Sequence, residues 1–227
     1  MQIWNLVEPR TGGAVCDRAL DAPCALVSAR GLEAAFVAGN PLAARGFALP
    51  RGSGAPALVV GSGWLEPESD DPVDAMDAAR RTWSEEGRRR FEQVWEDLAR
   101  AASEDGVSLW LRPAAGEVIG DIPGLRAIAS AGGPPLLIEP AALLTEGMLA
   151  DAEDHFVRML DPLEATGVVR AVLVTDLAGE AGSLRRVPVG EGRVGAGVLD
   201  RLVERAAGFA PVAVLEADAA RLAALAR

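Results

Sequence analysis

Short apolar runs alternate along this chain with longer segments of amphipathic character. The runs that we interpret as strands are residues 2–7, 24–29, 46–49, 56–63, 107–111, 135–138, 168–174 and a last run ending at Glu216. The segments expected to be helical are 31–45, with a break at Asn40-Pro41, then 72–105, 125–130, 150–163 and a helix that carries Leu199, Leu202 and Val203 on one face. Near-continuous apolar strands between amphipathic helices are typical of a parallel sheet with a helical cover. The pattern therefore predicts an α/β fold.

The longest amphipathic segment, 72–105, has apolar residues at a spacing of three and four, from Met76 through Trp83 and Phe91 to Ala102. It predicts one long helix on the outside of the sheet, broken near Gly87. The polar run 85–90 is either a solvated face or a partner site.

Charged side chains directly follow several of the expected strands. They are Arg112, Glu139, Asp176 and Glu216. Because the carboxyl ends of parallel strands gather at one face of an α/β barrel, where substrates bind, we expect these side chains to converge there.

Asp176, the sequence Pro-Val-Gly-Glu-Gly at 188–192, a helix and Leu215-Glu216 follow one another in an order that resembles the last third of xylose-isomerase-like TIM barrels, the sugar phosphate isomerase/epimerase superfamily. Residues 43–49 are similar to that family's first helix running into its second strand. The resemblance implies one (β/α) barrel domain over residues 1–227. A full barrel typically needs roughly 250 residues, so we expect it to be shortened or irregular in its N-terminal quarter.

The family builds a divalent metal site from Glu, Asp and His at the strand ends. Laid on that pattern, this chain has Arg112 in place of the first acid, and Ala142 and Leu173 in place of two histidines, while the three acids after the strands remain. Either those acids still bind a metal, or Arg112 pairs with them and replaces the metal charge. We predict no tight metal site and no other cofactor.

Arg185 and Arg186 lie in a Gly-rich segment, 179–192, which is either an anion-binding loop or a surface loop. His155, the only histidine, is expected on the outer face of a helix, which argues against Ser-His or Cys-His catalysis. Cys16 and Cys24 are expected to be reduced thiols.

Composition excludes further classes. All 22 cationic side chains are arginine and there is no tyrosine, so neither a lysine Schiff base nor a phenolic acid or base is available. A net charge of −11 argues against nucleic acid as a partner. No apolar run reaches the roughly 20 residues of a membrane span, and the N-terminus lacks the pattern of a signal peptide, so we expect a cytoplasmic protein with no membrane partner.

Two functions remain open, and with them the question of whether the chain is an enzyme. The first is a diverged sugar phosphate isomerase/epimerase-like barrel that acts on or binds a small polar ligand. The second is a non-catalytic barrel used for binding or assembly, with a homo-oligomer or a protein partner. For the first, the resemblance assigns Glu139 and Glu216 to catalysis. The residues expected to bind substrate are Arg112, Asp176, Arg185 and Arg186.

Overall fold

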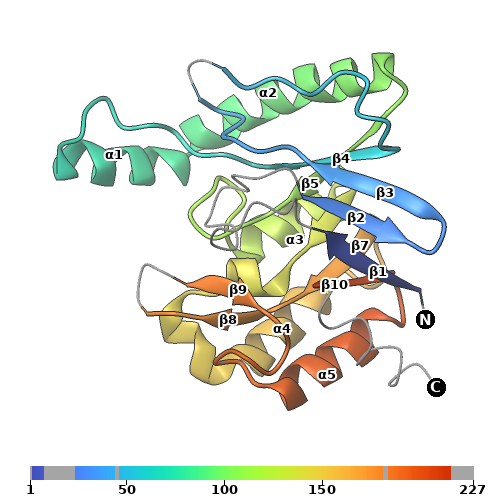
Figure 1. Ribbon diagram of the computed structural model, residues 1–227. Coiled ribbons are helices and arrows are strands. Elements are labelled where there is room, and N and C mark those ends of the chain that lie inside the picture. Colours follow the sequence, from blue (N-terminus) through green and yellow to red (C-terminus); the bar gives the residue numbers. More distant parts are fainter. Residues whose placement is uncertain (1, 8–23, 44–45, 181–183, 216–227) are drawn as a thin grey trace.

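The computed structural model describes residues 2–7, 24–43, 46–180 and 184–215, and in it eight strands close into a barrel (Figure 1). In spatial order the barrel runs β1-β10-β7-β6-β5-β4-β3-β2. The strands are β1 (Ile3–Val7), β2 (Ala25–Ser28), β3 (Gly31–Phe36), β4 (Ala57–Gly61), β5 (Ser108–Arg112), β6 (Leu136–Ile138), β7 (Val169–Val174) and β10 (Val212–Leu215). The predicted α/β barrel is thus confirmed.

From β4 onward, helices connect the strands and cover the barrel from outside (Figure 1). They are α1 (Pro72–Thr82), α2 (Glu85–Glu104), α3 (Ile122–Ser130), α4 (Ala152–Leu160) and α5 (Ala196–Ala206), with the short 3₁₀ turns η1 (Pro140–Leu143) and η2 (Glu146–Asp151). A separate hairpin of β8 (Asp176–Ala178) and β9 (Arg185–Val187) lies between β7 and α5. Among the described helices, none has both the length and the apolar character needed to cross a bilayer.

The N-terminal quarter is irregular, as the sequence predicted. β2 runs antiparallel to both β1 and β3, whereas the other barrel pairs are parallel. The helix expected over 31–45 is wrong: 31–36 is strand β3, and 37–43 is irregular. Ala34 and Phe36 alternate with more exposed neighbours and are buried inside the barrel, so a period of two prevails over the helical preference of alanine. The strand expected at 46–49 is also wrong, since these residues are irregular.

The barrel interior is filled by side chains from alternate strand positions. Trp4 of β1 and Trp110 of β5 stack there, with ring centroids 6.2 Å apart and ring planes 16° apart. Small residues such as Ala171 and Ala213 compensate for their bulk. The interior is therefore a packed core, and the chemistry lies at the ends of the strands.

The predicted long helix is two helices, and the break lies at Trp83-Ser84 instead of near Gly87. Ser84 caps α2 by accepting the Glu86 backbone N–H at 3.2 Å. Gly87 lies in the first turn of α2, where a β-carbon would collide with the Thr82 carbonyl at the end of α1. Glycine therefore permits the close approach of the two helices.

Candidate functional site

A buried cluster of two arginines and one glutamate occupies the carboxyl end of the barrel. Arg112 is the last residue of β5, Glu139 directly follows β6, and Arg186 comes from β9. Arg112 donates to Glu139 Oε2 from Nε at 2.7 Å and approaches it with Nη2 at 2.6 Å. Arg186 donates from Nε to Oε1 and from Nη2 to Oε2, the latter at 2.7 Å. The three residues are only 3%, 1% and 6% exposed, so the cluster is withdrawn from water.

The β8–β9 hairpin brings Arg186 into this cluster. β8 follows β7, and β9 runs antiparallel to β8, with Leu177 paired to Arg186. Arg185 and Arg186 point to opposite faces of β9, and of the two only Arg186 is buried. The loop expected at 179–192 therefore contains a strand, and the spacing of Val187 and Val189 was the signal for it.

The carboxylate of Glu139 is held ionised by its neighbours. Burial by itself would raise its pKa, but the charges of Arg112 and Arg186 and their hydrogen bonds outweigh burial and lower the pKa to about 2. The Thr175 hydroxyl donates a longer hydrogen bond to Oε1, at 3.3 Å. A carboxylate that is so fully engaged is a poor proton acceptor near neutral pH.

Asp176 makes a different set of contacts, although it too is fully buried. Its carboxylate accepts backbone N–H groups from Leu177 at 2.8 Å, Gly190 at 3.1 Å, Gly192 at 3.1 Å and Val194 at 3.0 Å. A β-carbon at Gly192 would overlap the carboxyl group, so this glycine lets the backbone reach it. Asp176 thus organises the segment that leads into α5.

Glu117, which our sequence reasoning missed, is a third buried acid at this end of the barrel, beside Glu139 and Asp176. It lies in the segment after β5 and is 5% exposed. Its Oε2 accepts the Ser62 backbone N–H at 2.6 Å, the Ser62 hydroxyl at 3.0 Å and the Gly63 N–H at 3.3 Å. Burial raises the pKa of Glu117 despite the opposing charge of Arg112 and these hydrogen bonds. Its position five residues beyond Arg112, after a strand end, was the available signal.

The other candidate residues lie apart from the cluster or outside the described residues. Glu216 and Cys16 are outside them. His155 lies on α4 beside the buried Phe156, on the outer layer as expected, and Cys24 is buried in the barrel interior. Leu173 also faces that interior.

A divalent metal, which the resemblance implies, does not fit the residues described at these strand ends. Glu139 already binds two guanidinium groups, and their positive charges repel a cation. Within the described ranges, no three His, Cys, Asp or Glu side chains come together as metal ligands. The predicted lack of a tight metal site stays a prediction, tested below.

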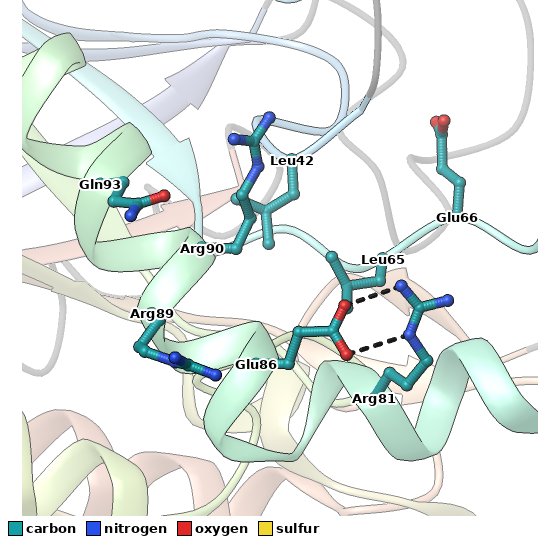
Figure 2. Close-up of a pocket in the computed structure, with 8 residues that line it drawn as sticks. All are labelled: Leu42, Leu65, Glu66, Arg81, Glu86, Arg89, Arg90 and Gln93. Atoms are coloured by element: carbon teal, nitrogen blue, oxygen red, sulfur yellow. Dashed lines mark hydrogen bonds and ion pairs between the residues drawn. The ribbon is translucent and has the colours of Figure 1, made fainter.

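A separate pocket of about 460 Å³ lies where α1 ends and α2 begins. Figure 2 shows Arg81 and Glu86 joined there by two hydrogen bonds, of 3.1 and 2.7 Å, with Arg89 and Arg90 farther along α2. The remaining residues that line it are Leu42, Leu65, Glu66 and Gln93. Opposite charges alternate around this pocket, as on a solvated face.

No protein-family model and no curated protein sequence matches the chain. Among solved structures, it is similar to a xylose isomerase domain protein from Planctomyces limnophilus, with 19% identity, 76% of this chain and 56% of that chain covered, and a TM-score of 0.43. For a xylose isomerase-like TIM barrel protein from Mycobacterium smegmatis in complex with magnesium, the corresponding values are 15%, 71%, 54% and 0.40. For mannonate dehydratase from Streptococcus suis serotype 2 they are 13%, 71%, 55% and 0.39.

The chain thus spans just over half the length of each of these proteins. The likeness concerns the fold alone. The barrel fold that the sequence resemblance predicted is confirmed by the closed eight-strand arrangement itself.

Proposed function

We propose that this chain is a non-catalytic barrel of the xylose-isomerase-like type, which serves in binding or assembly. The observation that carries the proposal is the saturation of Glu139 by Arg112 and Arg186 in a buried site. Isomerases and epimerases of this kind need a carboxylate that is free to take a proton from a carbon atom. Here the corresponding carboxylate, Glu139, is bound by two guanidinium groups. We therefore assign it a structural role and no part in proton transfer.

Proton abstraction can be tested directly. The purified chain is incubated in D₂O with a panel of aldoses, ketoses and their phosphates, with and without Mn²⁺, and deuterium incorporation at carbon is followed by NMR. We expect no incorporation beyond that of a sample without protein. Incorporation that is lost in Glu139→Gln but kept in Glu96→Gln, an exposed control on α2, would overturn the proposal.

A second candidate is a diverged enzyme that acts on a small polar substrate, and one observation favours it. Glu117 combines burial at the strand ends with a raised pKa, the combination that general acids often have. Under this alternative, Glu117→Gln abolishes deuterium exchange or ligand turnover while the fold is retained. An inactive wild type removes this alternative.

A further inference from the structure

The three most exposed large apolar residues in the described part of the chain lie together on one face at α1. Val73, Met76 and Trp83 are 70%, 62% and 61% exposed. Val73 and Met76 are three residues apart and therefore lie on one side of α1, and Trp83 directly follows the last residue of the helix. Only Ala78 and Thr82 of α1 are buried. The helix therefore presents its larger apolar side chains outward.

The position of α1 makes this face accessible. Figure 1 shows α1 at the edge of the molecule, extending away from the barrel. A cavity of about 210 Å³ borders the same helix, lined by Ala75, Ala78 and Ala79 of α1 and by Trp64, Leu65 and Pro67 of the preceding segment, among others.

Trp83 is held in one orientation on this surface. Its indole Nε1 donates to the Glu117 carbonyl oxygen at 3.1 Å, so its polar atom is satisfied inside the protein while the ring remains largely exposed. A fixed, exposed tryptophan loses little side-chain entropy on binding, which is the property of an interface anchor.

The order of charges along α1 indicates the partner. Asp74 and Asp77 lie in its first half, and Arg80 and Arg81 in its second half. Arg81 is already bound to Glu86, which leaves Arg80 for a partner. A second α1 in antiparallel orientation can place its Arg80 against Asp77, whereas a parallel one opposes like charges. In a two-fold arrangement centred between Ala78 and Ala79, Asp77 faces the Arg80 position of the other copy.

We infer that α1 is the contact surface of a homodimer, in which two copies of this helix pack antiparallel through Val73, Met76 and Trp83. Trp83 of one copy then lies near Val73 of the other. This inference goes beyond the proposed function and does not depend on it, because α1 lies outside the Arg112, Glu139 and Arg186 cluster.

Sedimentation velocity over a concentration series tests the dimer. We expect wild type to form dimers, and Met76→Asp to raise the dimer dissociation constant by roughly tenfold or more. Val157→Asp adds the same charge at an exposed apolar position on α4 and should leave the dimer unchanged. Circular dichroism checks that each variant is folded.

Charge exchange tests the orientation. Asp77→Arg and Arg80→Asp each place like charges opposite each other in the homodimer, so each variant should be mostly monomeric. When the two variants are mixed in equal amounts, a dimer of one copy of each has opposite charges facing each other at both contacts. This mixed dimer should therefore form. A monomeric wild type would overturn the inference, and so would a dimer whose dissociation constant is unchanged in all α1 variants. A monomer that binds a different protein through the exposed apolar face of α1 would overturn it as well.

These results separate the dimer from the chemistry at the strand ends. Deuterium exchange at carbon bears on the proposed function, whatever the oligomeric state. If an α1 variant loses the dimer and neither it nor the wild type exchanges deuterium at carbon, the result concerns the α1 contact alone.

Discussion

Apart from Asp176, which backbone N–H groups hold, two arginines and two glutamates interact at the carboxyl end of the barrel. Arg112 and Arg186 bind Glu139 directly, and Glu117 interacts electrostatically with Arg112. Two cations thus face two acids in a buried space, where an unbalanced charge is costly. The two acids nevertheless respond in opposite directions, since the pKa of Glu139 is lowered and that of Glu117 is raised. Their contributions to stability should therefore have opposite dependences on pH.

Arg112→Ala should destabilise the fold by about 3 kcal/mol near pH 7.5, because it leaves buried carboxylates with less compensating charge. The pKa of Glu117 is already raised in the folded state, and losing the opposing charge of Arg112 raises it further. Because such a group loses stability as pH rises through its folded-state pKa, this part of the deficit should shrink as pH falls toward 5. Urea denaturation across pH 5 to 8 measures it.

Arg170→Ala, at an exposed position of β7, is the matched control and should be nearly neutral. An Arg112→Ala variant as stable as wild type at every pH would show that Arg112 is free to hold a ligand. That outcome would support the diverged enzyme.

Glu117→Gln should stabilise the protein near neutral pH. The wild-type pKa is raised in the folded state, so stability falls as pH rises through it, whereas glutamine stays neutral and keeps an oxygen for the Ser62 and Gly63 N–H groups. The advantage of the variant should vanish at low pH, where wild-type Glu117 is protonated in both states. Chemical denaturation at pH 4.5 and pH 8 decides this, and a variant weaker than wild type at pH 8 contradicts the assignment.

At the scale of elements, the β8–β9 hairpin joins the site to the segment before α5. One face of the hairpin supplies Arg186 to the cluster, while Asp176 at the start of β8 binds the backbone of residues 190–194. The hairpin therefore positions both ends of the connection from β7 to β10. Its stability depends on one carboxylate that accepts four N–H groups.

Asp176→Ala should cost about 3 kcal/mol, because it leaves several buried or partly buried N–H groups without their acceptor. Hydrogen exchange should accelerate at the amides of Gly190, Gly192 and Val194. Asp176→Asn keeps one acceptor oxygen and should lose less stability. Unchanged exchange at those amides in Asp176→Ala would show that this contact does not hold the segment.

At the scale of the whole molecule, the barrel closes although its first described strands are not all parallel. β2 lies antiparallel between β1 and β3, and only residues 29–30 join it to β3, so all eight positions of the described barrel are paired. The outer helices are concentrated on the later units, and α1 extends beyond them (Figure 1). Closure protects the strand edges of the described barrel.

We predict that the purified protein holds no stoichiometric Mn²⁺ or Zn²⁺. The described strand ends offer guanidinium groups where the related pattern has ligands. Elemental analysis after dialysis measures the content. A stoichiometric metal that disappears in Glu139→Gln or Glu216→Gln would contradict the prediction.

Much of the fold and part of the site followed from the sequence. Apolar runs flanked by amphipathic segments predicted β5, β6, β7, β10 and the helices between them, because burial on both faces imposes this pattern on a parallel sheet. The place of Arg112 and Glu139 directly after strands predicted their contact, which the structure contains. These are local signals, set by residues near one another in the chain.

Only the tertiary structure decided the remaining features. Residues 31–36 form a strand because they pair with β2 on one side and β4 on the other. The alanine-rich local sequence does not reveal this pairing. Arg186, and not its neighbour Arg185, reaches Glu139 because β9 pairs with β8 in one register. Glu117 is buried against Ser62, a residue 55 positions away in the chain. Propensity and periodicity act over a few residues, whereas burial, charge compensation and pKa depend on which distant segments meet in space.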